Sequence, residues 1–146
     1  MGLDNGFYIR SNRRQLTREM LPAAIQYPFD SDMDEYGLEV IYHRKDWGWR
    51  NSIMSAFGWR TIVTQEDWEA VDEDSLYVID TPEQVMKLIE VTASWLDEEK
   101  WENEGDSIWE FEVARKHLIA DIINLALIYG FMQTNPDVYL QFYDSF

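Results

Sequence analysis

The sequence contains no cysteine, which excludes disulfide bonds and thiolate chemistry. It has only four prolines and seven glycines, and no low-complexity linker or internal repeat divides it. Apolar residues make up 46% of the chain, too large a share for a disordered protein. A length of 146 residues is typical of one domain. We therefore predict a single domain over residues 1–146.

Long hydrophobic runs are also lacking. The most apolar segment, residues 118–131, has 14 residues and is interrupted by Asp121 and Asn124. A membrane-spanning helix needs about 20 residues. No basic start followed by an apolar stretch opens the chain, so a secretory leader is not expected. We predict that residues 118–131 form a buried helix, that the protein does not bind a membrane, and that it is cytoplasmic.

Basic residues are scarce, with 12 Lys and Arg against 28 Asp and Glu, giving a net charge of −16. Residues 1–60 hold eight basic and eight acidic side chains, whereas residues 61–146 hold four and twenty. The whole excess of negative charge therefore lies in the second part of the chain. Because nucleic-acid binding depends on cations that replace counterions, direct binding of DNA or RNA is not expected.

Several segments have the pattern of short strands in the first half of the chain. Residues 6–11, 38–43 and 76–80 are rich in strand-forming residues, and residues 59–64 are a weaker candidate. Residues 137–146 alternate after Pro136 and predict an edge strand or a docked tail.

Helix signals are clearer. Asp46 and Gly58 are placed to cap a helix over residues 47–57. Thr81, Pro82 and Gln84 predict the start of a helix that runs to about residue 100, and a second long helix follows from about 106 to 130. The expected fold class is α+β, a small antiparallel sheet of short strands with two long C-terminal helices packed on one face.

The junction between the second strand and the first helix carries charge that suits an anion. A helix N-terminus offers free backbone N–H groups and the positive end of its dipole. The candidate ligand-binding residues are Arg44, Lys45, Arg50 and Asn51. The alternative is that these cations pair with acidic residues of the same chain.

His43 is one of only two histidines, and Asp4 at the start of the first strand is a conceivable acid–base partner. No nucleophile motif accompanies the pair, which favours a non-enzymatic protein. The series Asp30, Asp32 and Asp34 begins like a calcium loop, but the later glycine and glutamate are missing. We predict neither a metal nor a cofactor.

Residues 97–112 hold eight acidic side chains interleaved with aromatic ones. Aromatic anchors among polar groups are typical of protein interfaces. The candidate interaction residues are Asp97, Glu98, Glu99, Trp101, Glu102 and Glu104. The alternative is a solvated helix turn whose aromatic side chains point inward.

The start Met1-Gly2-Leu3-Asp4 leads into a strand, and Tyr42-His43-Arg44-Lys45 ends the second strand before a helix with an aromatic-rich end. Over roughly the first 60 residues, this arrangement resembles a group of small phage and prophage proteins without established activity. His43 stands where that group usually has a further aromatic. The resemblance implies a phage accessory setting and no particular mechanism.

The predicted function is that of a phage or prophage accessory protein that binds a bacterial or phage protein through its acidic C-terminal helices. The alternative is an enzyme that binds a small ligand or phosphate between His43 and Asn51. A homodimer sealed by the apolar helix around Leu125 is a third hypothesis.

Overall fold

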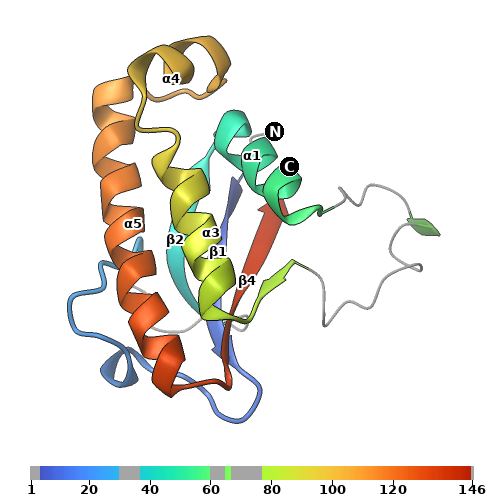
Figure 1. The fold of residues 1–146 in the computed structure, drawn as a ribbon, viewed down its shortest axis with the longest axis vertical. Helices are drawn as coiled ribbons and strands as arrows, with labels where there is room; N and C mark the ends of the chain where they lie inside the picture. Colours follow the sequence, from blue (N-terminus) through green and yellow to red (C-terminus); the bar gives the residue numbers. More distant parts are fainter. Residues whose placement is uncertain (1–3, 30–36, 60–64, 67–76, 146) are drawn as a thin grey trace.

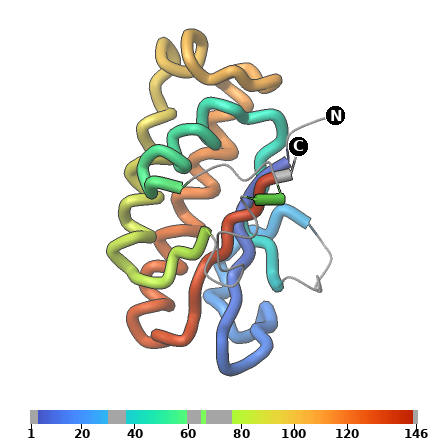
Figure 2. The backbone as a smooth tube through the Cα atoms, turned by 90° about the vertical axis from the view of Figure 1, so that its right-hand side faces the viewer, coloured from blue at the N-terminus to red at the C-terminus, as the bar shows by residue number. Residues whose placement is uncertain are grey.

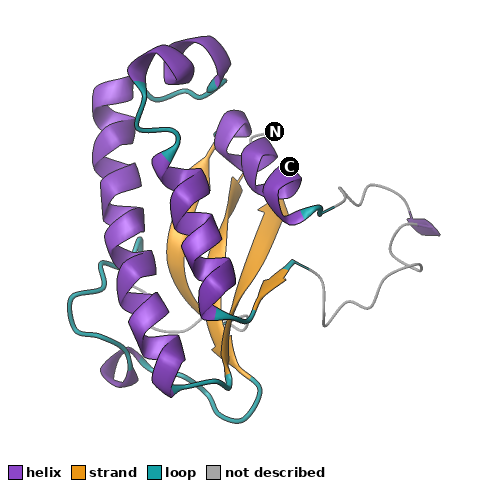
Figure 3. Cartoon of the chain, in the orientation of Figure 1, coloured by secondary structure: helices purple, strands orange, loops and turns teal. Residues whose placement is uncertain are grey.

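A four-stranded antiparallel sheet forms one layer of the part of the chain that the structure describes. This structure is a computed structural model, and it describes residues 4–29, 37–59, 65–66 and 77–145. The strands are β1 (Asp4–Ser11), β2 (Leu38–Arg44), β3 (Val78–Ile79) and β4 (Val138–Ser145). Their order across the sheet is β2-β1-β4-β3. The predicted α+β class is confirmed (Figure 3).

The helices form the second layer. They are α1 (Trp47–Phe57), α3 (Pro82–Ala93), α4 (Glu98–Glu104) and α5 (Phe111–Thr134), and a short 3₁₀ helix spans Arg18–Met20. Helices α1, α3 and α5 lie on the same side of the sheet (Figures 1 and 2). Helix α4 lies across the end of this layer, beside the start of α5.

Local capping chemistry places the starts of α1 and α3 as predicted. The Asp46 side chain accepts a hydrogen bond from the backbone N–H of Trp49, and Gly58 closes α1 in the left-handed conformation. At α3, Thr81 and Gln84 form a reciprocal capping box and Pro82 is the first helical residue.

The helix predicted to run from residue 82 to about 100 is shorter than expected. Helix α3 ends at Ala93, and Asp97 begins a separate helix by accepting a hydrogen bond from the N–H of Lys100. The second long helix starts at Phe111 rather than near residue 106, and continues to Thr134. Asp106, where this helix was predicted to begin, instead adopts a left-handed backbone conformation in the connection between α4 and α5.

The C-terminal segment is a central strand, so the prediction of an edge strand or a docked tail is wrong. Strand β4 pairs with β1 along its whole length and with β3 on its other side. Its inward side chains Leu140 and Phe142 are buried in the core. Residues 60–64 of the strand predicted over 59–64 lie outside the described residues, as do the calcium-like series Asp30 to Asp34 and Met1, Gly2 and Leu3.

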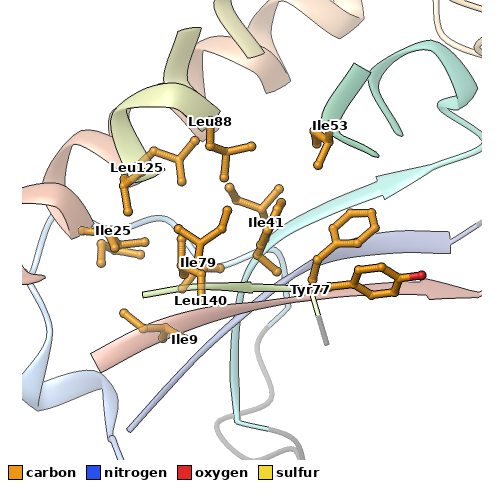
Figure 4. Packing of buried hydrophobic residues seen from close by; sticks show 14 of the residues in the cluster. Ile9, Ile25, Ile41, Ile53, Tyr77, Ile79, Leu88, Leu125 and Leu140 are labelled. Carbon is orange, nitrogen blue, oxygen red and sulfur yellow. The ribbon is translucent and has the colours of Figure 1, made fainter. Parts of the chain in front are cut away.

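The hydrophobic core lies between the sheet and the helices (Figure 4). Ile9, Ile41, Ile79 and Leu140 come from the four strands, and Leu88, Leu125 and Ile53 come from the helices. Helix α5 is long and apolar enough to cross a membrane by length and composition alone. One face of α5 nevertheless belongs to this core, because Leu125 and Ile128 are completely buried.

Candidate functional site

A row of polar side chains crosses the inner face of the sheet at one end. The strand register places Asn5 of β1 between His43 of β2 and Asp144 of β4. Directly opposed residues of antiparallel strands lie on the same face, and here that face is covered by helices. The Asn5 side chain is completely buried, and His43 is 1% exposed. Polar groups at this depth need partners inside the protein.

His43 lies between two carboxylates. Its Nδ1 atom is 2.7 Å from Oδ2 of Asp46, and its Nε2 atom is 2.6 Å from Oδ2 of Asp121. Two carboxylate acceptors require both ring nitrogens to donate, so the imidazole is a cation. The Trp49 ring stacks on the imidazole at 3.7 Å between ring centroids, with the planes only 6° apart. We call Asp46, His43, Asp121 and Trp49 the histidine cluster.

The protonation of His43 follows from these contacts. Burial alone would lower the pKa of His43, but the charge and hydrogen bond of Asp121, followed by those of Asp46, raise it to about 9. Burial raises the pKa of the Asp121 carboxyl, and the charge of His43 opposes that rise. The cluster therefore joins three elements, the end of β2, the N-cap of α1 and the middle of α5, through a buried charge network.

Arg50 forms the second buried ion pair in this row. Its Nε and Nη2 atoms both donate to Oδ2 of Asp144, at 3.0 and 2.7 Å, and Nη1 donates to Oδ1 of Asn51. Among the described residues, neither Oδ1 of Asp144 nor either polar atom of the Asn5 side chain has a hydrogen-bond partner. The ion pair therefore links the first turn of α1 to β4. For Arg50, this is the alternative to ligand binding considered above, namely pairing with an acidic residue of the same chain.

The predicted Asp4–His43 pair does not form. Asp4 is opposite Arg44 in the β1–β2 register, one position away from the pair formed by Asn5 and His43. Successive strand residues point to opposite faces, so Asp4 lies on the outer face, where its carboxylate accepts a hydrogen bond from the Tyr42 hydroxyl at 2.7 Å. The carboxylate partners of His43 are Asp46 and Asp121 instead.

The backbone donors at the start of α1, where an anion site was predicted, are occupied within the chain. The N–H of Trp47 donates to the carbonyl of Asp106, and that of Gly48 donates to the carbonyl of Gly105 at 2.8 Å. The following two N–H groups donate to Asp46. No backbone donor of this first turn is left for a phosphate.

The remaining ligand-binding candidates are scattered around this junction. Arg44 and Asn51 are exposed, whereas Lys45 is half-buried in a left-handed turn conformation between β2 and α1. Within the described residues, no group of three His, Cys, Asp or Glu side chains is arranged to hold a metal ion.

The end of the molecule built by α4 and its flanking turns is strongly acidic (Figure 1). We call residues 97–112 the acidic end. All eight of its carboxylates are exposed: Asp97, Glu98, Glu99, Glu102, Glu104, Asp106, Glu110 and Glu112. None of the ion pairs between described residues involves one of these eight acids, because the paired acids are Asp46, Asp121, Asp137 and Asp144. Ile108, 57% exposed, adds an apolar side chain to the same surface.

Trp101 belongs to the core, so its predicted place on the interaction surface is wrong. Its side chain is 5% exposed, and its indole N–H donates to the carbonyl of Trp109 at 3.0 Å. It also meets Trp95 edge to face, with ring centroids 6.1 Å apart. The inward tryptophan holds α4 in place, and the acids of α4 then point to solvent.

The arginines near the end of β1 do not neutralise the acidic end. Arg14 pairs with Asp137 at 3.1 Å, just beyond the C-terminus of α5. Arg18 donates to the carbonyl of Phe29 at 2.7 Å. The Arg14–Asp137 contact lies just beyond the C-terminus of α5, the end of this helix that is away from α4 (Figure 1).

Comparisons with known proteins add no precedent for either region. No family model matches the chain, and neither a curated protein nor a solved structure matches it significantly.

Sequence reasoning missed most of the histidine cluster. Asp46 was recognised only as a helix cap, and Asp121 only as an interruption of an apolar run. An acid in the middle of an otherwise buried helix is the signal that could have been used, because a buried charge requires a partner. The sequence alone does not identify His43 as that partner, 78 residues away.

Proposed function

We propose that this chain is a cytoplasmic accessory protein of the phage type that binds a basic surface of a bacterial or phage protein through its acidic end. The observation that carries the proposal is the exposure of all eight carboxylates of residues 97–112 at one end of the molecule. A concentrated field of one sign attracts a partner of opposite charge and accelerates the encounter.

The local architecture supports a contact role for the acidic end. Trp101 and Trp95 pack inward, so the carboxylates project from a short helix fixed to the rest of the fold. A rigid surface loses less conformational entropy on binding than a flexible one. The exposed side chain of Ile108 offers an apolar contact among the charges.

The histidine cluster supports a structural role rather than catalysis. Both ring nitrogens of His43 are engaged by carboxylates, so the imidazole has no free nitrogen to accept a proton from a substrate. The ring is buried and covered on one side by Trp49. We therefore propose that the cluster fixes α1 and α5 to the sheet.

The test is affinity capture from bacterial lysate with the wild type and a charge-neutralised variant. The variant carries Glu98→Gln, Glu99→Gln, Glu102→Gln and Glu104→Gln, all at exposed positions of α4. We expect the wild type to retain a basic protein at low salt and to release it at high salt. The variant should bind that protein about tenfold more weakly or worse.

The matched control removes four exposed charges elsewhere, through Glu66→Gln, Asp80→Asn, Glu83→Gln and Glu90→Gln. It has the same net charge as the α4 variant, so it separates the position of the acids from their number. The control should retain the partner as the wild type does. The proposal would be contradicted if both variants lost the same amount of binding. It would also be contradicted if the binding of the captured protein changed neither with salt nor in either variant.

A further inference from the structure

Helix α5 has a second, exposed face that is apolar. Ile119 and Ile123 are 36% and 51% exposed, and Ala126 and Gly130 are exposed as well. Their spacings of four, three and four residues place them along one side of the helix. We call these four residues the α5 stripe. Leu125, the residue around which the sequence predicted an interface, is instead completely buried in the core.

Neither the backbone conformation nor the packing of the single chain requires a glycine at position 130. Gly130 lies inside α5, its φ is not positive, and a Cβ atom added to it would meet nothing within 4 Å. Glycine weakens a helix interior relative to alanine. In a helix–helix contact, however, a glycine lets the neighbouring backbone or side chain approach closely.

The α5 stripe also carries no acidic residue, so two copies can share it without placing carboxylate against carboxylate. Residues 113–136 contain one acid, Asp121, which is buried against His43. The charged residues exposed on this segment are Arg115 and Lys116.

We propose that the α5 stripe binds the α5 stripe of a second copy of this chain, with the two helices antiparallel and the two-fold axis midway between Ile123 and Ala126. This register places Ile119 of one copy beside Gly130 of the other, and Ile123 beside Ala126. A two-fold contact of this kind is self-complementary and closes as a dimer. It does not depend on the proposed function of the acidic end.

The acidic ends decide between parallel and antiparallel pairing. The acidic end adjoins the N-terminus of α5, so parallel helices would bring two sets of eight carboxylates together. In the antiparallel pair they lie at opposite ends of a helix of 24 residues, roughly 36 Å long. That separation is several times the Debye length of about 8 Å at physiological salt.

The first test is the mass of the full-length protein in solution, measured by sedimentation equilibrium at micromolar concentration. We expect twice the monomer mass of 17.4 kDa. Ile123→Glu places two carboxylates near the axis and should weaken the dimer by roughly 100-fold. Met86→Glu adds the same charge at an exposed apolar position of α3 and should leave the dimer intact. Far-UV circular dichroism of each variant establishes that it is folded.

Cross-linking tests the register, because the chain has no cysteine of its own. Under mild oxidation of mixed single variants, Ile123→Cys should cross-link to Ala126→Cys, and Ile119→Cys should cross-link to Gly130→Cys. Met86→Cys should not cross-link. Three results would each overturn the proposal. The protein could be a monomer at all concentrations, the dimer could be unaffected by Ile123→Glu, or a monomer could bind phosphatidylcholine vesicles through α5.

Discussion

The strongest quantitative prediction concerns the substitution His43→Gln. His43 has a pKa of about 9 in the folded protein, against an ordinary value of 6.5. The proton is bound more tightly in the folded state, so its contribution to stability is fully present below pH 6.5 and is lost as the pH rises through 9. The difference of 2.5 pH units corresponds to about 3 kcal/mol of folding free energy.

His43→Gln removes this cation and leaves Asp46 and Asp121 facing each other in the interior. Breaking a buried ion pair by removing one partner typically costs about 3–5 kcal/mol, which agrees with the pKa argument. The assay is urea denaturation of both proteins between pH 6 and pH 9, followed by tryptophan fluorescence. The free-energy gap between wild type and variant should be largest at pH 6 and should shrink by about 3 kcal/mol toward pH 9.

The matched control is His117→Gln, since His117 is the other histidine and is exposed on α5. Its free-energy gap from the wild type should be smaller than that of His43→Gln, because the His117 side chain is exposed and stacks on Trp109 instead of bridging two buried carboxylates. A gap for His43→Gln that does not change with pH, or that widens as the pH rises, would refute the assignment of a buried imidazolium.

Three further substitutions test the packing and capping. Gly48→Ala should destabilise the fold by about 1–3 kcal/mol, because the new Cβ atom would lie 2.7 and 2.8 Å from backbone oxygens of the α4–α5 connection. Asn124→Ala should cost about 1–3 kcal/mol, since its amide group bonds both backbone polar groups of Gln26 and the carbonyl of Val40. Thr81→Ala should cost about 1 kcal/mol through loss of the α3 capping box. Urea denaturation measures all three losses, and an unchanged midpoint and slope would contradict the corresponding contact.

The sequence predicts those parts of the fold that depend on neighbours along the chain. Asp46, Gly58 and Thr81 act within one turn of their own helix, so their capping roles can be predicted without knowledge of the tertiary structure. The same holds for β1 and β2, whose strand-forming residues are consecutive. The α+β class follows from these local signals.

The features that sequence reasoning missed depend on contacts between distant segments. Strand β4 alternates as an edge strand would, and only its pairing with β1 and β3 makes it central. The donors at the start of α1 are occupied by the carbonyls of Gly105 and Asp106, more than 50 residues away. Asp121 has a residue type that suits a surface, and Trp101 lies among acidic residues in the sequence, but tertiary packing buries both.

The central claim is that the acidic end carries the binding activity, and the most direct measurement is the salt dependence of the dissociation constant for the captured partner. Titration calorimetry at low and high salt should be performed on the wild type, the α4 variant and the matched control with four other acids removed. The account predicts a steep loss of affinity with salt for the wild type and the control, and a markedly shallower one for the α4 variant. Identical salt dependence in all three proteins would contradict it.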